Sequence, residues 1–195
     1  MTTLVLLLHG VGSNGADLRP LSHPFAQSLP GAVFLLPDGP QPFDGGGRAR
    51  QWFSVAGVTE ANRPWRIEAA RPGLDALIDA GQAQAKADRV VLIGFSQGSI
   101  MALDALARGK VAEVVAFAGR LAFTGTPTPL PQARALLVGG TADQVISHHL
   151  SAEAGDRLSA AGVDAKVVIL PGVPHTITPE GIAAAQAFLA RQQAA

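Results

Sequence analysis

The sequence predicts an α/β fold in which helices cover both faces of a mostly parallel central sheet of about six strands. Short apolar, β-branched runs alternate along the chain with longer segments of helical periodicity. The runs are apolar at nearly every position, which is typical of strands buried on both faces of a parallel sheet. With 195 residues, of which 48% are hydrophobic and 15% charged, the chain has the length and composition of one globular domain, residues 1–195.

Each expected element follows from its own pattern. Pro72 lies inside one helical segment and must either kink that helix or delay its start. Thr178 followed by Pro179 predicts the N-cap and first residue of the last helix. The segment 39–62 has no clear periodicity, and its three consecutive glycines indicate a flexible loop. We place strands at 3–8, 32–36, 89–95, 113–117, 134–138 and 165–170, and helices at 65–80, 97–108, 147–161 and from 179 onward.

Charge and composition narrow the classes of partner. Lys plus Arg and Asp plus Glu number 15 each and form no long run of one sign, so we expect no binding to nucleic acid. The chain has no cysteine, which excludes disulfides, thiolate metal sites and a cysteine nucleophile. The apolar run 4–8 is far shorter than the about 20 residues that span a membrane, and nothing around it resembles a signal peptide. We therefore expect a cytoplasmic protein, without stable membrane insertion, that acts on a small molecule.

The clearest chemical motif is the segment 94–98, which reads GFSQG. It follows a predicted strand and opens a predicted helix, the context of a nucleophile elbow. In such an elbow a sharp turn projects the Ser96 hydroxyl from the sheet, and the glycines on either side remove side chains that would clash. An ordinary Gly- and Ser-containing turn is the alternative, and the strand and helix on either side favour the elbow.

A serine nucleophile needs a general base and a group that orients the base. Asp143 follows the strand predicted at 134–138, and His175 follows the strand predicted at 165–170. Serine, acid and histidine thus occur in the order expected for such an elbow, each at the carboxyl end of a parallel strand, where α/β sheets build their sites. Singly, the aspartate could cap a turn and the histidine could be structural, but together they predict a catalytic triad.

Backbone amides are the expected stabilisers of a negatively charged oxygen beside Ser96. The turn at the elbow directs the N–H of Gln97 towards that position, and the turn after the first strand offers the N–H of Val11 as its partner. We interpret His9 as a residue that holds this turn. No Cys, and no carboxylate at ligand spacing from a histidine, suggests a metal site, so we expect neither metal nor cofactor.

These residues resemble the phospholipase and carboxylesterase group of α/β-hydrolases, which includes bacterial carboxylesterases and acyl-protein thioesterases. The similarity extends over nearly the whole chain and rests on HGVGSNG (9–15), DLRPL (17–21), QWF (51–53), GFSQG (94–98), TADQV (141–145) and PGVPHTITP (171–179).

The resemblance implies an α/β-hydrolase fold and hydrolysis of carboxylic esters, thioesters or lysophospholipids through an acyl-enzyme intermediate. It implies that Ser96, Asp143 and His175 form the triad and that Val11 and Gln97 supply the oxyanion donors. It also implies a substrate pocket beside Trp52, Phe53 and Val145, although core packing is an equally good role for the Trp-Phe pair. Members of the group often form homodimers, so a homodimer stays open. Relatives commonly have a second glycine where this chain has Ser99, and the sequence of the loop 43–50 is particular to this chain. Because pocket shape depends on such loops, the natural substrate stays open.

One alternative from another class is a dinucleotide-binding domain. Gly10, Gly12 and Gly15 spell G-x-G-x-x-G after the first strand, and Asp38 follows the second. However, the spacing from Gly10 to Asp38 is larger than the about 20 residues typical of that motif. This interpretation also leaves Ser96, Asp143 and His175 unexplained. A non-catalytic protein that keeps the fold is a third class, which a complete triad disfavours. Residues 118–133 are rich in Gly, Pro and Thr, so we expect a loop there, no cap domain and an open site.

Overall fold

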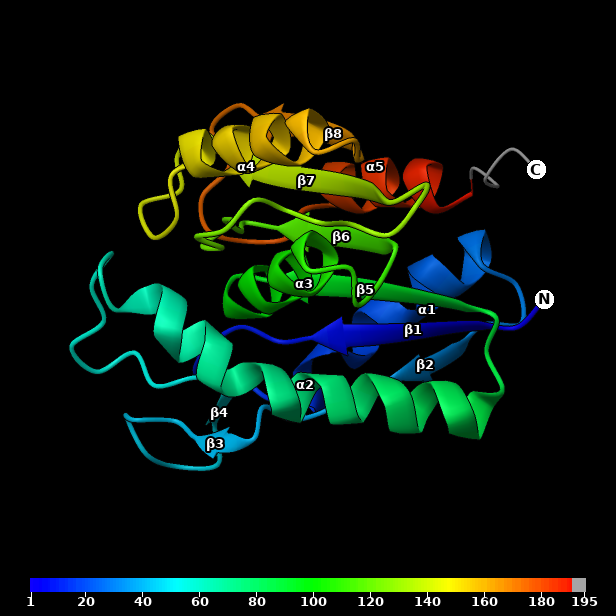
Figure 1. Ribbon diagram of the computed structural model, residues 1–195, viewed down its shortest axis with the longest axis horizontal. Helices are drawn as coiled ribbons and strands as arrows, with labels where there is room; N and C mark the ends of the chain where they lie inside the picture. Colours follow the sequence, from blue (N-terminus) through cyan, green and yellow to red (C-terminus); the bar gives the residue numbers. More distant parts are fainter. Residues whose placement is uncertain (191–195) are drawn as a thin grey trace.

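The computed structural model describes residues 1–190, which form a six-stranded parallel sheet flanked by helices (Figure 1). All neighbouring strands pair in parallel, in the order β2-β1-β5-β6-β7-β8. All six predicted strands are present, and the second and the last two differ from the prediction by one or two residues at an end. The strands are β1 Thr3–Leu8, β2 Val33–Leu35, β5 Arg89–Phe95, β6 Glu113–Phe117, β7 Arg134–Gly140 and β8 Asp164–Leu170.

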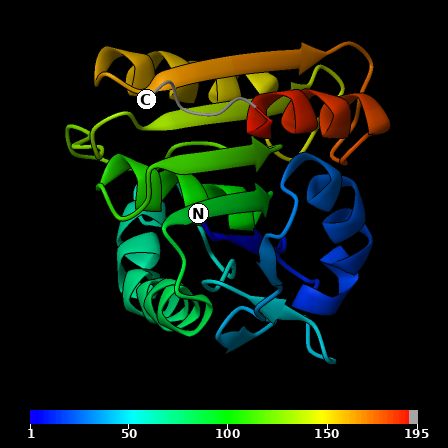
Figure 2. The ribbon, with the colours of Figure 1, turned by 90° about the vertical axis from the view of Figure 1, so that its right-hand side faces the viewer.

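The alternation of side chains along β1 shows how the two layers of core arise. Leu4, Leu6 and Leu8 point to the face covered by α2, α3 and α4, whereas Val5 and Leu7 point to the face covered by α1 and α5. Figure 2 shows α1 and α5 together on one side of the sheet. The predicted fold with helices on both faces is therefore confirmed. The helices are α1 Arg19–Ser28, α2 Arg63–Ala85, α3 Gln97–Ala107, α4 His148–Ala160 and α5 Pro179–Leu189.

Two helices differ from the prediction by more than one residue at an end. α1, preceded by the 3-10 turn η1 Gly15–Leu18, was not expected, because it contains two prolines and buries only Phe25. α2 begins before and ends after the predicted 65–80, with Lys86 in a left-handed conformation at its end. It continues through Pro72, and Figure 1 shows its axis changing direction along its first half. The proline therefore kinks the helix instead of delaying its start.

The loop expected at 39–62 has more structure than its composition indicates. Two short strands, β3 Gln41–Pro42 and β4 Arg50–Gln51, pair antiparallel within it. The Asp44 carboxylate then accepts hydrogen bonds from the Gln51 side chain and from the Ser54 hydroxyl, and also from the N–H groups of Val55 and Ala56. Led by the Gln51 bond, these contacts lower the pKa of Asp44 to about 2. The three glycines lie in the connection between these two strands, whereas the strand pair and the contacts of Asp44 were not expected.

The segment between β6 and β7 contains no helix or strand, as predicted. It leaves β6 at Ala118 and reaches β7 at Arg134 without adding a cap domain over the carboxyl edge of the sheet. Of the helices in residues 1–190, none is both long and apolar enough to cross a membrane.

Candidate active site

Ser96 sits in a strained turn between β5 and α3. Its backbone has φ 53° and ψ −114°, a conformation that costs free energy for any residue with a side chain. The chain around it is packed too tightly for larger residues: a Cβ on Gly94 would lie 2.5 Å from the backbone of Gly98, and a Cβ on Gly98 would lie 2.0 Å from the Leu8 carbonyl oxygen. The Ser96 N–H donates to the carbonyl of Phe117 on the neighbouring strand. These contacts hold the turn in the elbow geometry that the motif predicts.

The structure brings the three predicted triad residues into one hydrogen-bonded chain. His175 Nε2 lies 2.9 Å from Ser96 Oγ, and His175 Nδ1 lies 2.7 Å from Asp143 Oδ2. The three residues come from the loops that follow β5, β7 and β8, at the carboxyl edge of the sheet. The imidazole packs against the ring of Phe95, whose centroid is 4.9 Å away. The side chain of His175 keeps 18% of its surface exposed, so the site is open to a small ligand.

Asp143 is held more firmly than either partner. Its side chain is fully buried, and its second oxygen, Oδ1, accepts hydrogen bonds from the N–H groups of Val145 and Ile146 at 2.8 and 2.9 Å. A fixed carboxylate facing Nδ1 sets the ring orientation of His175, so that Nε2 faces the serine.

A comparison with protein families identifies the family of the chain. The sequence profile of the family described as Phospholipase/Carboxylesterase matches residues 1–193. The chain belongs to this family.

Individual relatives support the same activity. The chain is 36% identical to Esterase YpfH of Escherichia coli K12 over 179 residues, which cover 89% of this chain and 76% of that protein. It is 23% identical to Acyl-protein thioesterase 1 homolog 1 of Dictyostelium discoideum over 201 residues, 96% of this chain and 89% of that protein. The crystal structure of esterase PE8 superposes with a TM-score of 0.85 and 32% identity, covering 96% of this chain and 91% of that one.

The chain is accordingly an ester-cleaving α/β-hydrolase, and the comparisons do not favour a dinucleotide-binding domain. The glycine-rich turn has a different use in this esterase. The Asp38 carboxylate, which that alternative takes as the acidic residue of the motif, accepts a hydrogen bond of 2.8 Å from the N–H of Gly15. Asp38 therefore closes the turn itself. In residues 1–190, no cluster of three or more His, Cys, Asp or Glu side chains is placed to hold a metal ion.

The segment Arg50 to Phe53 links the two turns that carry the predicted oxyanion donors. On one side, Arg50 exchanges backbone hydrogen bonds with Gly12 and Ser13, next to Val11. On the other side, the Trp52 N–H donates to Gln97 Oε1, and Gln97 Nε2 donates to the Phe53 carbonyl, both at 2.7 Å. The sequence predicts a role only for the backbone of Gln97, so this role of its side chain was not expected. Its N–H opens α3, so it lies outside the hydrogen bonds of that helix.

His9 is completely buried under the same turn and supports its backbone. Its Nε2 accepts the N–H of Gly39 at 2.8 Å, so the proton of the neutral ring is on Nδ1, which donates to the Gly10 carbonyl at 2.7 Å. The Trp52 indole donates to the His9 carbonyl. Burial lowers the pKa of His9 more than its bond to Gly10 raises it. This placement fits the turn-holding role that the sequence predicts.

The three predicted pocket residues lie in different surroundings. Trp52 is fully buried in the core and lines no described cavity. Phe53 is also buried but forms part of the wall of a cavity of about 260 Å³. Val145 is 69% exposed, immediately beside the loop that holds Asp143. The structure thus places Trp52 as a packing residue, and it leaves Phe53 and Val145 as candidates to contact a substrate.

Ser99, which replaces a common glycine, is accommodated by its surroundings. Its buried hydroxyl lies 2.7 Å from the carbonyl oxygens of both Gly94 and Phe117, on neighbouring strands. A glycine faces it: a Cβ at Gly119 would lie 2.4 Å from the Ser99 Cβ. The extra side chain therefore ties the elbow to β6, and a missing side chain on the opposite segment makes room for it.

Proposed function

We propose that this esterase hydrolyses carboxylic esters and thioesters by a two-step mechanism in which Ser96 is the nucleophile. The observation that supports this most strongly is the continuous hydrogen-bonded chain from Ser96 Oγ through His175 to Asp143. The hydroxyl proton passes to Nε2 as Oγ bonds to the substrate carbonyl carbon, and the carbonyl oxygen gains the negative charge. The imidazolium then returns that proton to the departing alcohol or thiol, which leaves an acyl-serine.

The second step repeats the first with water in place of the serine. Nε2 takes a proton from water, hydroxide adds to the acyl carbon, and the imidazolium returns the proton to Ser96 Oγ as the acid leaves. Asp143 does not take up a proton in either step, and its carboxylate stabilises the imidazolium through the hydrogen bond to Nδ1.

The charged oxygen of each intermediate needs donors that are already in place. We assign the N–H groups of Val11 and Gln97 to this task. The N–H of Gln97 is the first of α3, where the helix dipole also favours a negative charge. Donors of this kind contribute about 3 kcal/mol each to the transition state in serine hydrolases.

For substrate, we propose singly dispersed esters with acyl groups of short to medium length. Support comes from the segment between β6 and β7, which adds no cap over the site. An open site makes few apolar contacts, each buried methylene contributing about 0.8 kcal/mol at most, so selection by chain length should be modest. A cytoplasmic location, a single domain and a homodimer remain predictions, and size-exclusion chromatography with light scattering tests the last.

Labelling by a fluorophosphonate probe, followed by mass spectrometry of the labelled peptide, tests the mechanism directly. We expect the label on Ser96, loss of labelling and turnover in Ser96→Ala and His175→Ala, and a smaller loss in Asp143→Ala. Ser159→Ala, on the exposed face of α4, serves as the matched control and should label normally. Substantial turnover by folded Ser96→Ala would rule out this assignment.

A further inference from the structure

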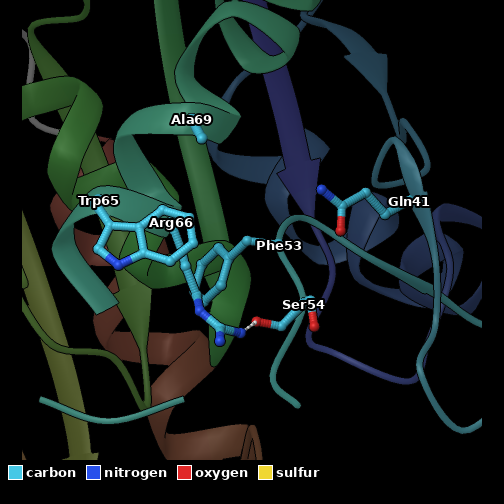
Figure 3. A pocket seen from close by; sticks show the side chains of 6 residues that line it. All are labelled: Gln41, Phe53, Ser54, Trp65, Arg66 and Ala69. Atoms are coloured by element: carbon cyan, nitrogen blue, oxygen red, sulfur yellow. Dashed lines mark hydrogen bonds between the residues drawn. The ribbon is translucent and has the colours of Figure 1, made fainter. Parts of the chain in front are cut away.

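A small cavity lies between the first half of α2 and the loop after β4 (Figure 3). Its volume of about 260 Å³ exceeds the about 150 Å³ of an engineered protein cavity that holds benzene. One wall is aromatic, made by the ring of Phe53 and the 58% exposed ring of Trp65. The cavity is lined by Gln41, Phe53, Ser54, Trp65, Arg66 and Ala69.

One hydrogen bond joins the wall of this cavity to the candidate active site. The carbonyl of Phe53 accepts a hydrogen bond from the side chain of Gln97, the residue that directly follows Ser96. The Phe53 side of the cavity is therefore connected to the elbow through the buried side chain of Gln97. The proposed two-step mechanism does not use the cavity. The cavity is therefore available to a part of the substrate that lies away from the ester bond.

Arg66 gives the cavity a positive charge that no carboxylate neutralises by an ion pair. Within residues 1–190, its one hydrogen bond to the protein goes from Nη1 to the neutral carbonyl of Ser54, at 2.6 Å. Its guanidinium carbon lies 5.5 Å from the centre of the Trp65 ring, and Figure 3 shows the side chain running beside that ring. Its Nε is buried without an acceptor. Arginine carries five N–H donors, so most of its capacity to bind an anion is unused.

The acidic neighbours of Arg66 are already occupied. Asp44 is joined to it only through Ser54, whose hydroxyl donates to Asp44 while its carbonyl accepts from Arg66. The Asp44 carboxylate accepts four hydrogen bonds of its own. Glu68, two positions after Arg66, pairs with Arg71 instead. The charge at the cavity therefore stays available to an incoming carboxylate.

We propose that the cavity binds the end of the substrate remote from the ester, and that Arg66 makes this esterase select esters that carry a second, ionised carboxylate. The apolar chain of such a substrate would lie against Phe53 and Trp65, and the carboxylate would meet the terminal N–H groups of Arg66. A charge-assisted bond from a carboxylate to guanidinium is stronger than a neutral hydrogen bond. This inference rests on the proposed function, because it needs the ester at Ser96.

The test compares two series of methyl esters of the dicarboxylic acids from succinate to suberate. In one series the second carboxyl is free, and in the other it is also methylated and hence neutral. For the best chain length, Arg66→Met should lower kcat/KM for the free-acid ester by about tenfold or more and for the dimethyl ester by less than about twofold. Arg66→Lys should lose less, and added NaCl should weaken the preference of the wild type.

Arg48→Met is the matched control, because it removes the same charge from an exposed site on the neighbouring loop outside the cavity lining. It should leave the ratio of the two esters unchanged. Equal losses on both esters in Arg66→Met would show that Arg66 only supports Ser54, and a wild type without preference for the free acid would also overturn the inference. Turnover by Ser96→Ala would instead refute the proposed function, so the two failures are distinguishable.

Discussion

The side-chain amide of Gln97 donates a hydrogen bond of 2.7 Å to the carbonyl of Phe53, 44 residues earlier in the chain. The same amide accepts the N–H of Trp52, so it pairs with the backbone as a strand neighbour would. Because the backbone of Gln97 is the proposed oxyanion donor, this pairing fixes the donor relative to the segment that also holds the turn of Val11. A shift of about 1 Å in such a group can cost about a hundredfold in rate.

Gln97→Met keeps the size of the side chain but removes both hydrogen bonds. We expect kcat to fall on the order of tenfold to a hundredfold with little change in KM, since the donor acts in the transition state. Binding of a trifluoromethyl ketone, which mimics the tetrahedral intermediate, should weaken in proportion. Gln82→Met, in the distant part of α2, provides the control for a glutamine replaced by methionine. A Gln97→Met variant with normal kcat would show that the pairing is only structural.

Ser99 and Gly119 should behave as a coupled pair. Gly119→Ala places a methyl group 2.4 Å from the Ser99 Cβ, and overpacking of this kind costs about 1–3 kcal/mol. In a Ser99→Gly background the same substitution should cost much less. Urea denaturation of the two single variants and the double variant gives the coupling energy. Additive effects in that cycle would mean that the surrounding chain relaxes around the clash.

Buried, neutral His9 should make the stability of the fold depend on pH. The unfolded chain takes up a proton below the ordinary pKa of 6.5, whereas folded His9 does so only at lower pH. Between the pKa of folded His9 and that of the unfolded chain, the unfolded state binds more protons. The contribution of His9 to the free energy of unfolding is therefore complete above pH 6.5 and is lost as the pH is lowered below it. The slope from this one residue reaches about 1.4 kcal/mol per pH unit.

His9→Gln can keep a donor and an acceptor but cannot titrate, so its free energy of unfolding should vary less between pH 7.5 and pH 5.5, about the range of histidine titration. Thermal or urea denaturation across that range measures the effect. His23→Gln, on the exposed surface of α1, should leave the wild-type slope intact. If both variants keep that slope, His9 is not its source.

The open site should show no activation at interfaces. Residues 118–133 form a connection without a helix that could act as a lid. Contact with a substrate aggregate therefore has no lid to open and should not raise the activity. The rate on one ester, followed through its critical micelle concentration, should rise smoothly to saturation. A sharp increase above that concentration would demonstrate a mobile cover and contradict this prediction.

The sequence predicts most of the sheet and the triad because both depend on local patterns. Continuous apolar runs mark the six strands, and the strand ends bring Ser96, Asp143 and His175 to one edge. β7 extends further than expected because its last residues, Gly139 and Gly140, have no strand preference of their own.

What the sequence does not predict depends on contacts between distant segments. The Gln97 side chain meets residues 52 and 53 across the site, and no local pattern distinguishes it from any helical glutamine. Asp44 organises its loop through bonds that span up to 12 positions, which a loop composition rich in glycine conceals. α1 was missed for a related reason: it packs on α5 and buries Phe25, whereas its two prolines disfavour a helix when the sequence is considered alone.

The position of His175 has a consequence for synthesis of the protein in the cell. The histidine follows β8, which is the last strand within residues 1–190 and an edge strand of the sheet, and it lies 79 residues after Ser96. A growing polypeptide thus exposes its serine long before the general base has left the ribosome. Under the proposed mechanism the nascent chain stays chemically inert until β8 docks beside β7, so the onset of hydrolysis during refolding or translation reports the completion of the sheet.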